Sequence, residues 1–301
     1  MNMKVDLCGV TLKNPVMTAS GTFGSGAEYA EFVDLNKLGA VVTKGVANVP
    51  WPGNPTPRVA EVYGGMLNAV GLQNPGIDLF VERDIPFLKQ FDTKIMVNVC
   101  GHSTEEYIEV VERLRDQPVD LLEINISCPN VKEGGIAFGQ DPKAVEAITK
   151  EMKKHAAQPV IMKLSPNVTD ITEMARAAEA GGADGLSLIN TITGMKIDIN
   201  RQKFVLANKT GGMSGPAIHP VAVRMVYQTA QAVRLPIVGM GGIMNAEDAI
   251  EMILAGATAV SVGTANFTNP HVTEEIVAGI RDYMERYQVA DIRDLVGAVH
   301  E

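Results

Sequence analysis

The hydrophobic positions of this chain fall into short, nearly continuous runs and do not alternate with polar ones. Eight such runs stand at residues 16–18, 40–43, 94–98, 121–125, 160–163, 185–189, 237–239 and 259–262. Parallel strands covered on both faces have this pattern, because neither face of the strand meets water. The pattern therefore predicts eight buried parallel strands.

Signals for helix starts separate several of these runs. Ser103 and Asp170 each stand three residues before a glutamate, which is the spacing of a capping box. Asp141 precedes Pro142 and an apolar stripe follows, and Asn245 precedes another stripe. Strand and helix alternating over eight strands favour an α/β fold, a (β/α)8 TIM barrel, over an open doubly wound sheet.

No linker divides the chain, so we expect residues 1–301 to form a single barrel domain. The residues before Val16 are expected to form an N-terminal hairpin that closes the barrel floor. Two long insertions, 50–76 and 194–215, are rich in Gly, Asn and Pro. Long loops on a barrel usually shape its C-terminal mouth, where active sites lie.

Composition narrows the classes of function. The chain has 301 residues, 46% hydrophobic and 20% charged, with a net charge of −9, which is ordinary for a globular protein and leaves no basic surface for nucleic acid or anionic membrane. Lys4 and Asp6 interrupt the N-terminal apolar residues, so we expect no signal peptide or anchor and a cytoplasmic location. The three cysteines are too far apart for a CxxC pair and are expected to be reduced thiols.

The residues directly after the predicted strands are unusually polar. They are Ser20, Lys44, Asn98, Asn125, Lys163, Asn190, Gly241 and Thr264. One asparagine there is readily explained as a turn former, but three asparagines and two lysines at one rim indicate a binding site. A lysine at a barrel mouth can form a Schiff base, anchor an anion or place charge beside a flavin ring, and the residues alone leave these alternatives open.

Glycines follow the last two predicted strands, in Gly239-Met-Gly-Gly242 and Val262-Gly-Thr264. Barrels commonly bind phosphate at this position, because glycines let backbone amides approach an oxyanion closely. The alternative is a pair of tight turns. The five histidines show no HExxH or paired ligand spacing, so no metal site is predicted.

A lone thiol follows the run 121–125, in the segment Asn125-Ile-Ser-Cys-Pro-Asn130. Pro129 disfavours simple continuation into a helix, and Gly134-Gly135 suggests a loop able to move over a ligand. Cys128 is therefore the candidate catalytic residue; Cys100 is the nearest rival, and Cys8 is expected to be a small apolar filler near the floor. A thiol can act as a base where its surroundings favour thiolate.

Together these motifs resemble class 1 dihydroorotate dehydrogenases, flavin enzymes of pyrimidine biosynthesis, over essentially the whole chain. The motifs are Asn14-Pro-Val-Met-Thr-Ala-Ser-Gly21, Thr43-Lys-Gly45, Asn68-Ala-Val-Gly-Leu-Gln-Asn74, Asn125-Ile-Ser-Cys-Pro-Asn130, Met162-Lys-Leu-Ser-Pro166 and Gly239-Met-Gly-Gly-Ile243. The resemblance implies one FMN per chain, with its phosphate near Gly215, Gly241, Gly242, Gly263 and Thr264. It implies further flavin contacts from Ala19, Ser20, Lys44, Gly45, Asn98, Asn125, Lys163 and Ile189.

The same resemblance implies a site for dihydroorotate, which would be formed by Lys44, Asn68, Val70, Gly71, Leu72, Asn125, Asn130, Asn190 and Thr191. Cys128 would remove the C5 proton while hydride passes from C6 to the flavin. A serine in its place would be similar to the membrane-associated class 2 enzymes.

Within class 1, the motifs look most like the NAD-linked catalytic subunit (class 1B). That type implies a partner chain carrying FAD and a [2Fe-2S] cluster, in a heterotetramer of two catalytic and two electron-transfer chains. The alternatives are a fumarate-linked homodimer (class 1A), a dihydropyrimidine dehydrogenase, or a non-redox phosphate-binding barrel such as an isomerase or aldolase.

Overall fold

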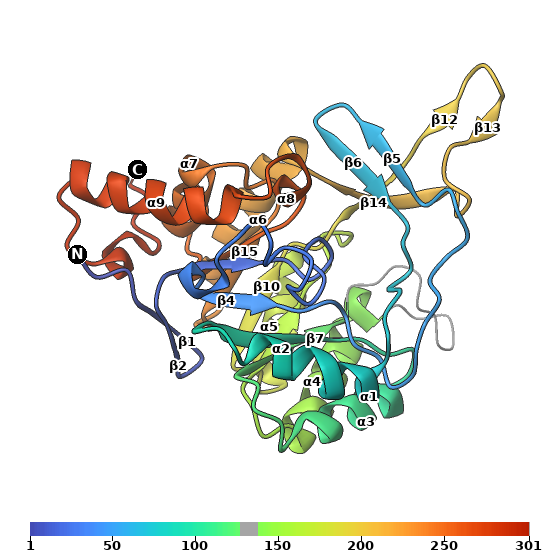
Figure 1. Ribbon diagram of the computed structural model, residues 1–301, viewed down its shortest axis with the longest axis horizontal. Coiled ribbons are helices and arrows are strands. Elements are labelled where there is room, and N and C mark those ends of the chain that lie inside the picture. Colours follow the sequence, from blue (N-terminus) through green and yellow to red (C-terminus); the bar gives the residue numbers. More distant parts are fainter. Residues whose placement is uncertain (127–137, 301) are drawn as a thin grey trace.

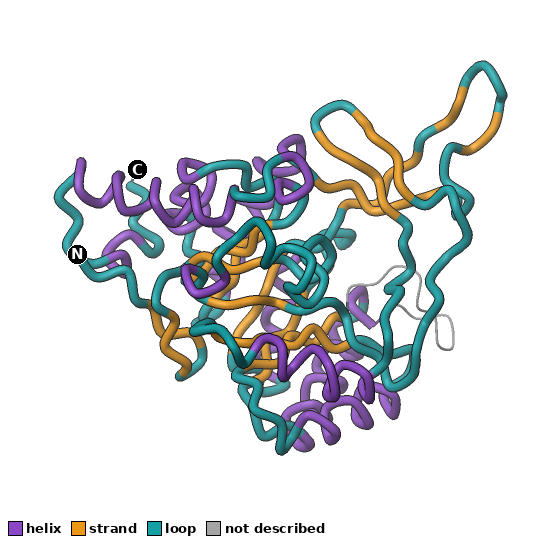
Figure 2. The backbone as a smooth tube through the Cα atoms, viewed as in Figure 1, coloured by secondary structure: helices purple, strands orange, loops and turns teal. Residues whose placement is uncertain are grey.

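The computed structural model of the chain describes residues 1–126 and 138–300. Eight parallel strands close into a barrel at its centre (Figures 1 and 2). In barrel order they are β3 (Val16–Thr18), β4 (Ala40–Val42), β7 (Lys94–Val99), β8 (Leu121–Asn125), β9 (Val160–Lys163), β10 (Gly185–Leu188), β15 (Ile237–Met240) and β16 (Ala259–Val262). All eight predicted strands are present, and the predicted (β/α)8 TIM barrel is confirmed.

Helices surround the barrel and connect its strands (Figure 2). The longer ones are α3 (Thr104–Leu114), α4 (Pro142–His155), α5 (Ile171–Ala180), α6 (His219–Ala232), α7 (Ala246–Leu254) and α9 (Val272–Arg286). Shorter helical segments are η1 (Leu35–Lys37), α1 (Ile77–Leu79), η2 (Phe80–Asp84), α2 (Ile85–Leu88), η3 (Phe138–Gln140), η4 (Pro216–Ile218), α8 (Ala265–Thr268) and η5 (Ile292–Leu295).

The predicted helix starts are confirmed by the capping contacts. Ser103 accepts a hydrogen bond from the backbone N–H of Glu106, and Asp141, Asp170 and Asn245 accept from the first turns of α4, α5 and α7. Each cap satisfies an amide that has no partner inside the helix. The capping box at Ser103 is half formed, because the Glu106 carboxylate accepts from the backbone N–H of His102.

The core lies between the strands and the apolar stripes of these helices. Leu114 of α3, Met152 of α4, Ile253 of α7 and Ile280 of α9 are all fully buried in one hydrophobic cluster with the strands. Burying one such side chain contributes roughly 1.5–3 kcal/mol. The helices are therefore held by packing, and they fix the strand ends that carry the site.

The N-terminal segment forms the predicted hairpin, β1 (Val5–Leu7) and β2 (Val10–Leu12), which pair antiparallel. Its turn contains Cys8, and a Cβ built on Gly185, at the start of β10, would lie 2.7 Å from the Cys8 sulfur. Because β10 starts at the barrel floor, the hairpin closes the floor as predicted. Burial raises the pKa of the Cys8 thiol to about 12, assisted by Asp184 and Asp6.

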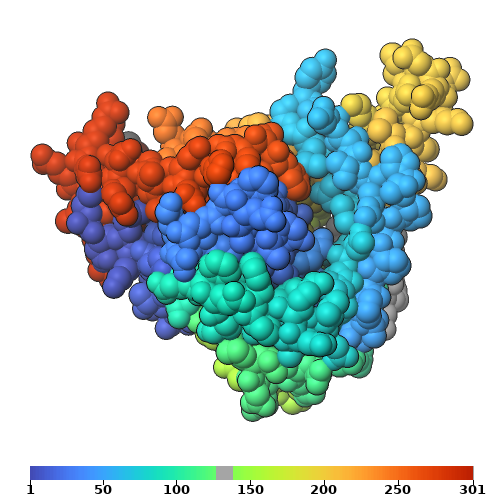
Figure 3. All heavy atoms as spheres, in the orientation of Figure 1, coloured from blue at the N-terminus to red at the C-terminus, as the bar shows by residue number. Residues whose placement is uncertain are grey.

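The two long insertions meet in one antiparallel sheet at the other end of the barrel. β5 (Val59–Val62) and β6 (Gly65–Asn68) come from the first, and β11 (Ile192–Met195) and β14 (Thr210–Ser214) frame the second. The sheet order is β11-β14-β6-β5, and a two-stranded hairpin, β12 (Ile197–Asp198) and β13 (Lys203–Phe204), extends beyond it. Figures 1 and 3 show these hairpins rising clear of the barrel. Among the described residues, no helix combines the length and apolarity needed to cross a membrane.

Candidate active site

A cavity of about 400 Å³ opens at the carboxyl ends of the barrel strands, beneath the antiparallel sheet β11-β14-β6-β5, which we call the mouth sheet. In (β/α)8 barrels, catalytic residues gather at this end of the strands. Sixteen predicted site residues line it: Ala19, Ser20, Lys44, Asn68, Val70, Gly71, Leu72, Asn125, Lys163, Ile189, Asn190, Thr191, Gly241, Gly242, Gly263 and Thr264. The fold thus brings together positions from Ala19 to Thr264 in one concave site.

Three predicted residues stand behind the cavity wall and do not line it. Asn98 is fully buried, and a Cβ built on Gly45 would lie 3.0 Å from its side-chain oxygen. Gly215 places its carbonyl oxygen 2.7 Å from a Cβ built on Gly242. These residues shape the wall. Cys128 and Asn130 lie outside the residues that the structure describes.

The glycines after β15 form a cradle with no room for side chains. Gly241 has a φ of +130° and Gly242 a φ of +68°. A Cβ on Gly241 would lie 2.7 Å from that of Ala222, and one on Gly242 would lie 2.8 Å from that of His219. Backbone in this conformation without side chains leaves its amides accessible to an anion. Thr264, which follows the neighbouring strand β16, donates to the Ser214 hydroxyl at 2.6 Å, and both residues line the cavity.

Two lysines reach the cavity in different electrostatic settings. Lys163 is buried, and its ammonium lies 3.4 Å from a carboxylate oxygen of Glu123 and 3.4 Å from the Ser20 hydroxyl. Lys44 has no carboxylate within 4 Å among the described residues. Burial lowers the pKa of Lys44; the Cys100 thiol opposes this shift and Arg58 adds to it. Burial therefore disfavours the charged form of Lys44.

Three asparagine side chains supply further polar groups to the cavity. Asn125, at the end of β8, donates from its side-chain amide to the Asn98 side-chain oxygen at 3.4 Å. The buried Tyr107 hydroxyl donates to the backbone carbonyl of Asn125 at 2.7 Å. Asn68 comes from the mouth sheet, and Asn190 follows β10 and accepts from the N–H of Thr191 at 2.8 Å. Amides offer both donors and acceptors, so this wall suits a planar polar ligand.

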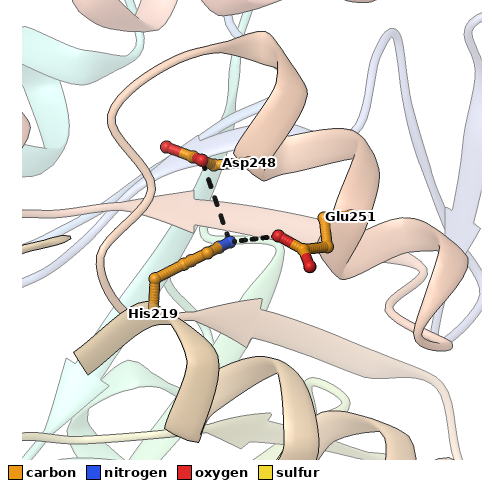
Figure 4. A group of neighbouring side chains, drawn as sticks. All are labelled: His219, Asp248 and Glu251. Carbon is orange, nitrogen blue, oxygen red and sulfur yellow. Dashed lines mark hydrogen bonds and ion pairs between the residues drawn. The ribbon is translucent and has the colours of Figure 1, made fainter. Parts of the chain in front are cut away.

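A group of titratable residues behind the glycine cradle was missed by the sequence reasoning. His219 begins α6, and Asp248 and Glu251 lie on α7 (Figure 4). The His219 Nδ1 donates to the Gly241 carbonyl at 2.8 Å, while Nε2 lies 3.1 Å from Glu251 and 4.0 Å from Asp248. Such a group can hold a divalent cation or act as an ion pair, and the prediction of no metal stays a prediction. Its members come from two helices, so no local spacing reveals them.

The chain is similar in sequence to known proteins over nearly its whole length. The family model for dihydroorotate dehydrogenase matches residues 2–284. The chain belongs to the dihydroorotate dehydrogenase family. It is 72% identical over 299 residues to the "dihydroorotate dehydrogenase B (NAD(+)), catalytic subunit" of Lachnoclostridium phytofermentans, covering 99% of this chain and 100% of that one. The protein of the same name from Alkaliphilus metalliredigens is 65% identical, covering 99% of both chains.

A solved structure supports the same fold. The dihydroorotate dehydrogenase of Eimeria tenella, in complex with ferulenol, superposes with a TM-score of 0.81, covering 99% of this chain and 88% of that chain. Its sequence identity is 22%, so it bears on the fold alone. The resemblance to the class 1B type of dihydroorotate dehydrogenase, an oxidoreductase, is confirmed by the full-length relatives.

Proposed function

We propose that this chain oxidises dihydroorotate to orotate in de novo pyrimidine biosynthesis, with bound FMN, as the catalytic subunit of an NAD-linked enzyme. The observation that carries the proposal is the cavity itself. It combines a glycine cradle on one side with lysine and asparagine side chains on the other, in a chain whose full-length relatives are named dihydroorotate dehydrogenase B catalytic subunits. The cytoplasmic location and the single FMN-binding domain stay predictions of the sequence.

The residues present fit FMN. The phosphate would lie against Gly241, Gly242, Gly263 and Thr264, where the cradle leaves backbone amides accessible. The ring would lie toward Ala19, Ser20, Lys44, Asn125, Lys163 and Ile189, which line the cavity at the ends of other strands. Bound there, FMN would supply the two-electron acceptor that takes the hydride from C6 of the substrate.

Dihydroorotate has ring amides and a carboxylate, and the remaining cavity groups match them. Asn68, Asn125 and Asn190 can donate to and accept from the ring amides, and the Lys44 ammonium can pair with the carboxylate. Because burial disfavours the charge of Lys44, an anionic substrate would relieve that cost. The side chain of Leu72 and the backbone of Val70 and Gly71 would enclose the ring.

Cys128 is the proposed general base, on the strength of its place in the segment after β8. Asn130, in the same segment, is proposed to bind the substrate. The thiolate would take the C5 proton and so leave the electron pair that forms the new double bond as hydride departs from C6. The catalytic role of Cys128 thus concerns one proton at one carbon.

The electrons must then leave the chain. We propose a partner subunit with FAD and a [2Fe-2S] cluster that passes them to NAD, in a heterotetramer of two chains of each kind. The names of the relatives, which specify NAD(+) and a catalytic subunit, support this route over fumarate reduction by a homodimer.

The test is anaerobic reduction of the FMN-loaded chain. Dihydroorotate is expected to bleach the flavin absorbance in stoichiometric amount, and dihydrouracil is the control for a dihydropyrimidine dehydrogenase. Cys128→Ser should keep FMN and lose most of the reduction rate at neutral pH. A chain that takes up no FMN, or that is reduced by dihydrouracil alone, would contradict the proposal. Co-purification of an iron–sulfur flavoprotein tests the partner, and turnover with fumarate in its absence would favour the homodimer.

A further inference from the structure

A carboxylate lies inside the barrel directly behind the cavity wall. Glu123 of β8 is fully buried and does not line the cavity. Its Oε1 accepts from the Ser187 hydroxyl at 2.7 Å, and its Oε2 accepts from the Asn98 amide at 2.5 Å and faces the Lys163 ammonium at 3.4 Å. Groups from three neighbouring strands therefore converge on this carboxylate.

The strand register explains why these groups meet. Asn98 of β7 is the register partner of Glu123, and Lys163 of β9 is the partner of both Asn125 and Ser187. Glu123 and Asn125 are two residues apart on one strand, so both point to the same face of the sheet, which is the barrel interior. The carboxylate is thus one layer below the asparagine that lines the cavity.

Because Glu123 is fully buried, its charge depends on the pairing with Lys163. A buried charge costs several kcal/mol unless it is paired and hydrogen-bonded. Among the described residues, the Lys163 ammonium is the only cationic group within 4 Å of Glu123. Glu123 and Lys163 therefore form an ion pair whose opposite charges offset each other at a distance. Of the two residues, only Lys163 lines the cavity.

The contact with Asn98 has a second effect. A carboxylate can only accept, so the Asn98 NH₂ must face Glu123, and its oxygen then faces the Asn125 NH₂ at 3.4 Å. The carboxylate thereby orients two amides in sequence, and the second one lines the cavity.

We infer that Glu123 is a positioning residue for the proposed reaction. It holds the Lys163 ammonium at the cavity wall, offsets part of its charge, and sets the orientation of the Asn98 and Asn125 amides. The inference rests on the proposed function, because the charge acts on a flavin bound in the cavity. A positive charge near a flavin favours its reduced, electron-rich form. Removing the offsetting carboxylate therefore makes the bound flavin easier to reduce.

The test is the midpoint potential of FMN bound to the full chain. Glu123→Gln keeps the shape of the side chain and removes its charge. The substitution should change the equilibrium constant for flavin reduction at least tenfold in favour of the reduced form, which is a positive shift of about 30 mV in the two-electron potential. In a Lys163→Met background, the same substitution should shift the potential far less, because a fully buried carboxylate without its cationic partner is held neutral and leaves no charge to remove. Thr149→Val removes a buried hydroxyl of α4 outside the barrel and should leave the potential unchanged while lowering stability.

An unchanged or negative shift in Glu123→Gln, or an equal shift in the Lys163→Met background, would overturn the inference. If Glu123→Gln does not fold, Glu123→Asp takes its place in the test. Its shorter side chain retains the charge but moves it away from Lys163. A smaller positive shift is then expected, and an unchanged potential overturns the inference equally. The wild-type chain distinguishes a failure of the proposed function from a failure of the inference, because the proposed function requires that it takes up FMN and is reduced by dihydroorotate. If the wild type fails, the proposed function fails and the inference with it; if only the variants fail, the inference alone is overturned.

Discussion

The glycine cradle can be tested by adding a single methyl group. Gly242→Ala places a Cβ at a φ of +68°, 2.7 Å from the Gly215 carbonyl oxygen and 2.8 Å from the His219 Cβ. The left-handed conformation costs about 1–2 kcal/mol and the overpacking about 1–3 kcal/mol. The reduced entropy of the unfolded chain offsets about 0.4–1 kcal/mol. The free energy of unfolding should therefore fall by about 1–5 kcal/mol when these estimates are added.

Gly263→Ala is the matched control, because Gly263 also lines the cavity. Its added Cβ would lie 3.5 Å from the nearest atom, the Ala19 Cβ, at an ordinary contact distance and without positive φ. Urea unfolding of the apo chain followed by circular dichroism measures both variants, and FMN fluorescence titration measures cofactor affinity. Gly242→Ala should lose stability and FMN affinity, while Gly263→Ala should stay within about 0.5 kcal/mol of wild type in stability. Equal unfolding free energies in the two variants would refute the cradle argument.

Other side chains of the site give further predictions. The pKa of Lys44 is lowered in the folded chain, so the unfolded chain binds more protons at pH values between the lowered pKa and the ordinary lysine pKa of 10.5. This lysine therefore makes the free energy of unfolding rise with pH in that window. The stability difference between Lys44→Met and wild-type apo chain, measured by urea unfolding across alkaline pH, should therefore shrink as pH rises; a constant difference contradicts this. Tyr107→Phe removes the 2.7 Å hydrogen bond to the Asn125 carbonyl and should cost about 1 kcal/mol in the same assay, whereas an unchanged midpoint would show that the bond contributes nothing. His219→Ala removes the donor to the Gly241 carbonyl and should weaken FMN binding at the phosphate side, measured by fluorescence titration against free riboflavin, which lacks the phosphate; equal losses for both ligands would contradict that role.

The barrel was predictable because its strands and helices carry local signals. Residues 121–125 form a continuous apolar run around one glutamate, and the run is a fully buried strand. Ser103 caps the helix that its spacing predicts. These signals depend on a few neighbouring residues and on burial, both of which the sequence displays directly.

The mouth sheet was not predictable in the same way. β6 pairs with β14 across more than a hundred residues of chain, through Asn68 and Gly212. These strands are short and rich in glycine, so their side chains show neither alternation nor a continuous apolar run. The insertions were expected to shape the mouth, but their joining into one sheet depends on a pairing that no local pattern encodes.

The candidate site was predictable in its outer layer only. Reading the residue after each strand found Asn125 and Lys163, which line the cavity, but passed over Glu123 because it stands inside an apolar run. The available signal was the period of two along a strand, which places Glu123 on the same inward face as Asn125. A charged residue two positions before a polar strand end is then a residue that must find a partner inside the barrel, since an unpaired charge there costs several kcal/mol. The partner is the lysine at the end of the next strand, so the two features that looked separate along the chain are one electrostatic unit in the fold.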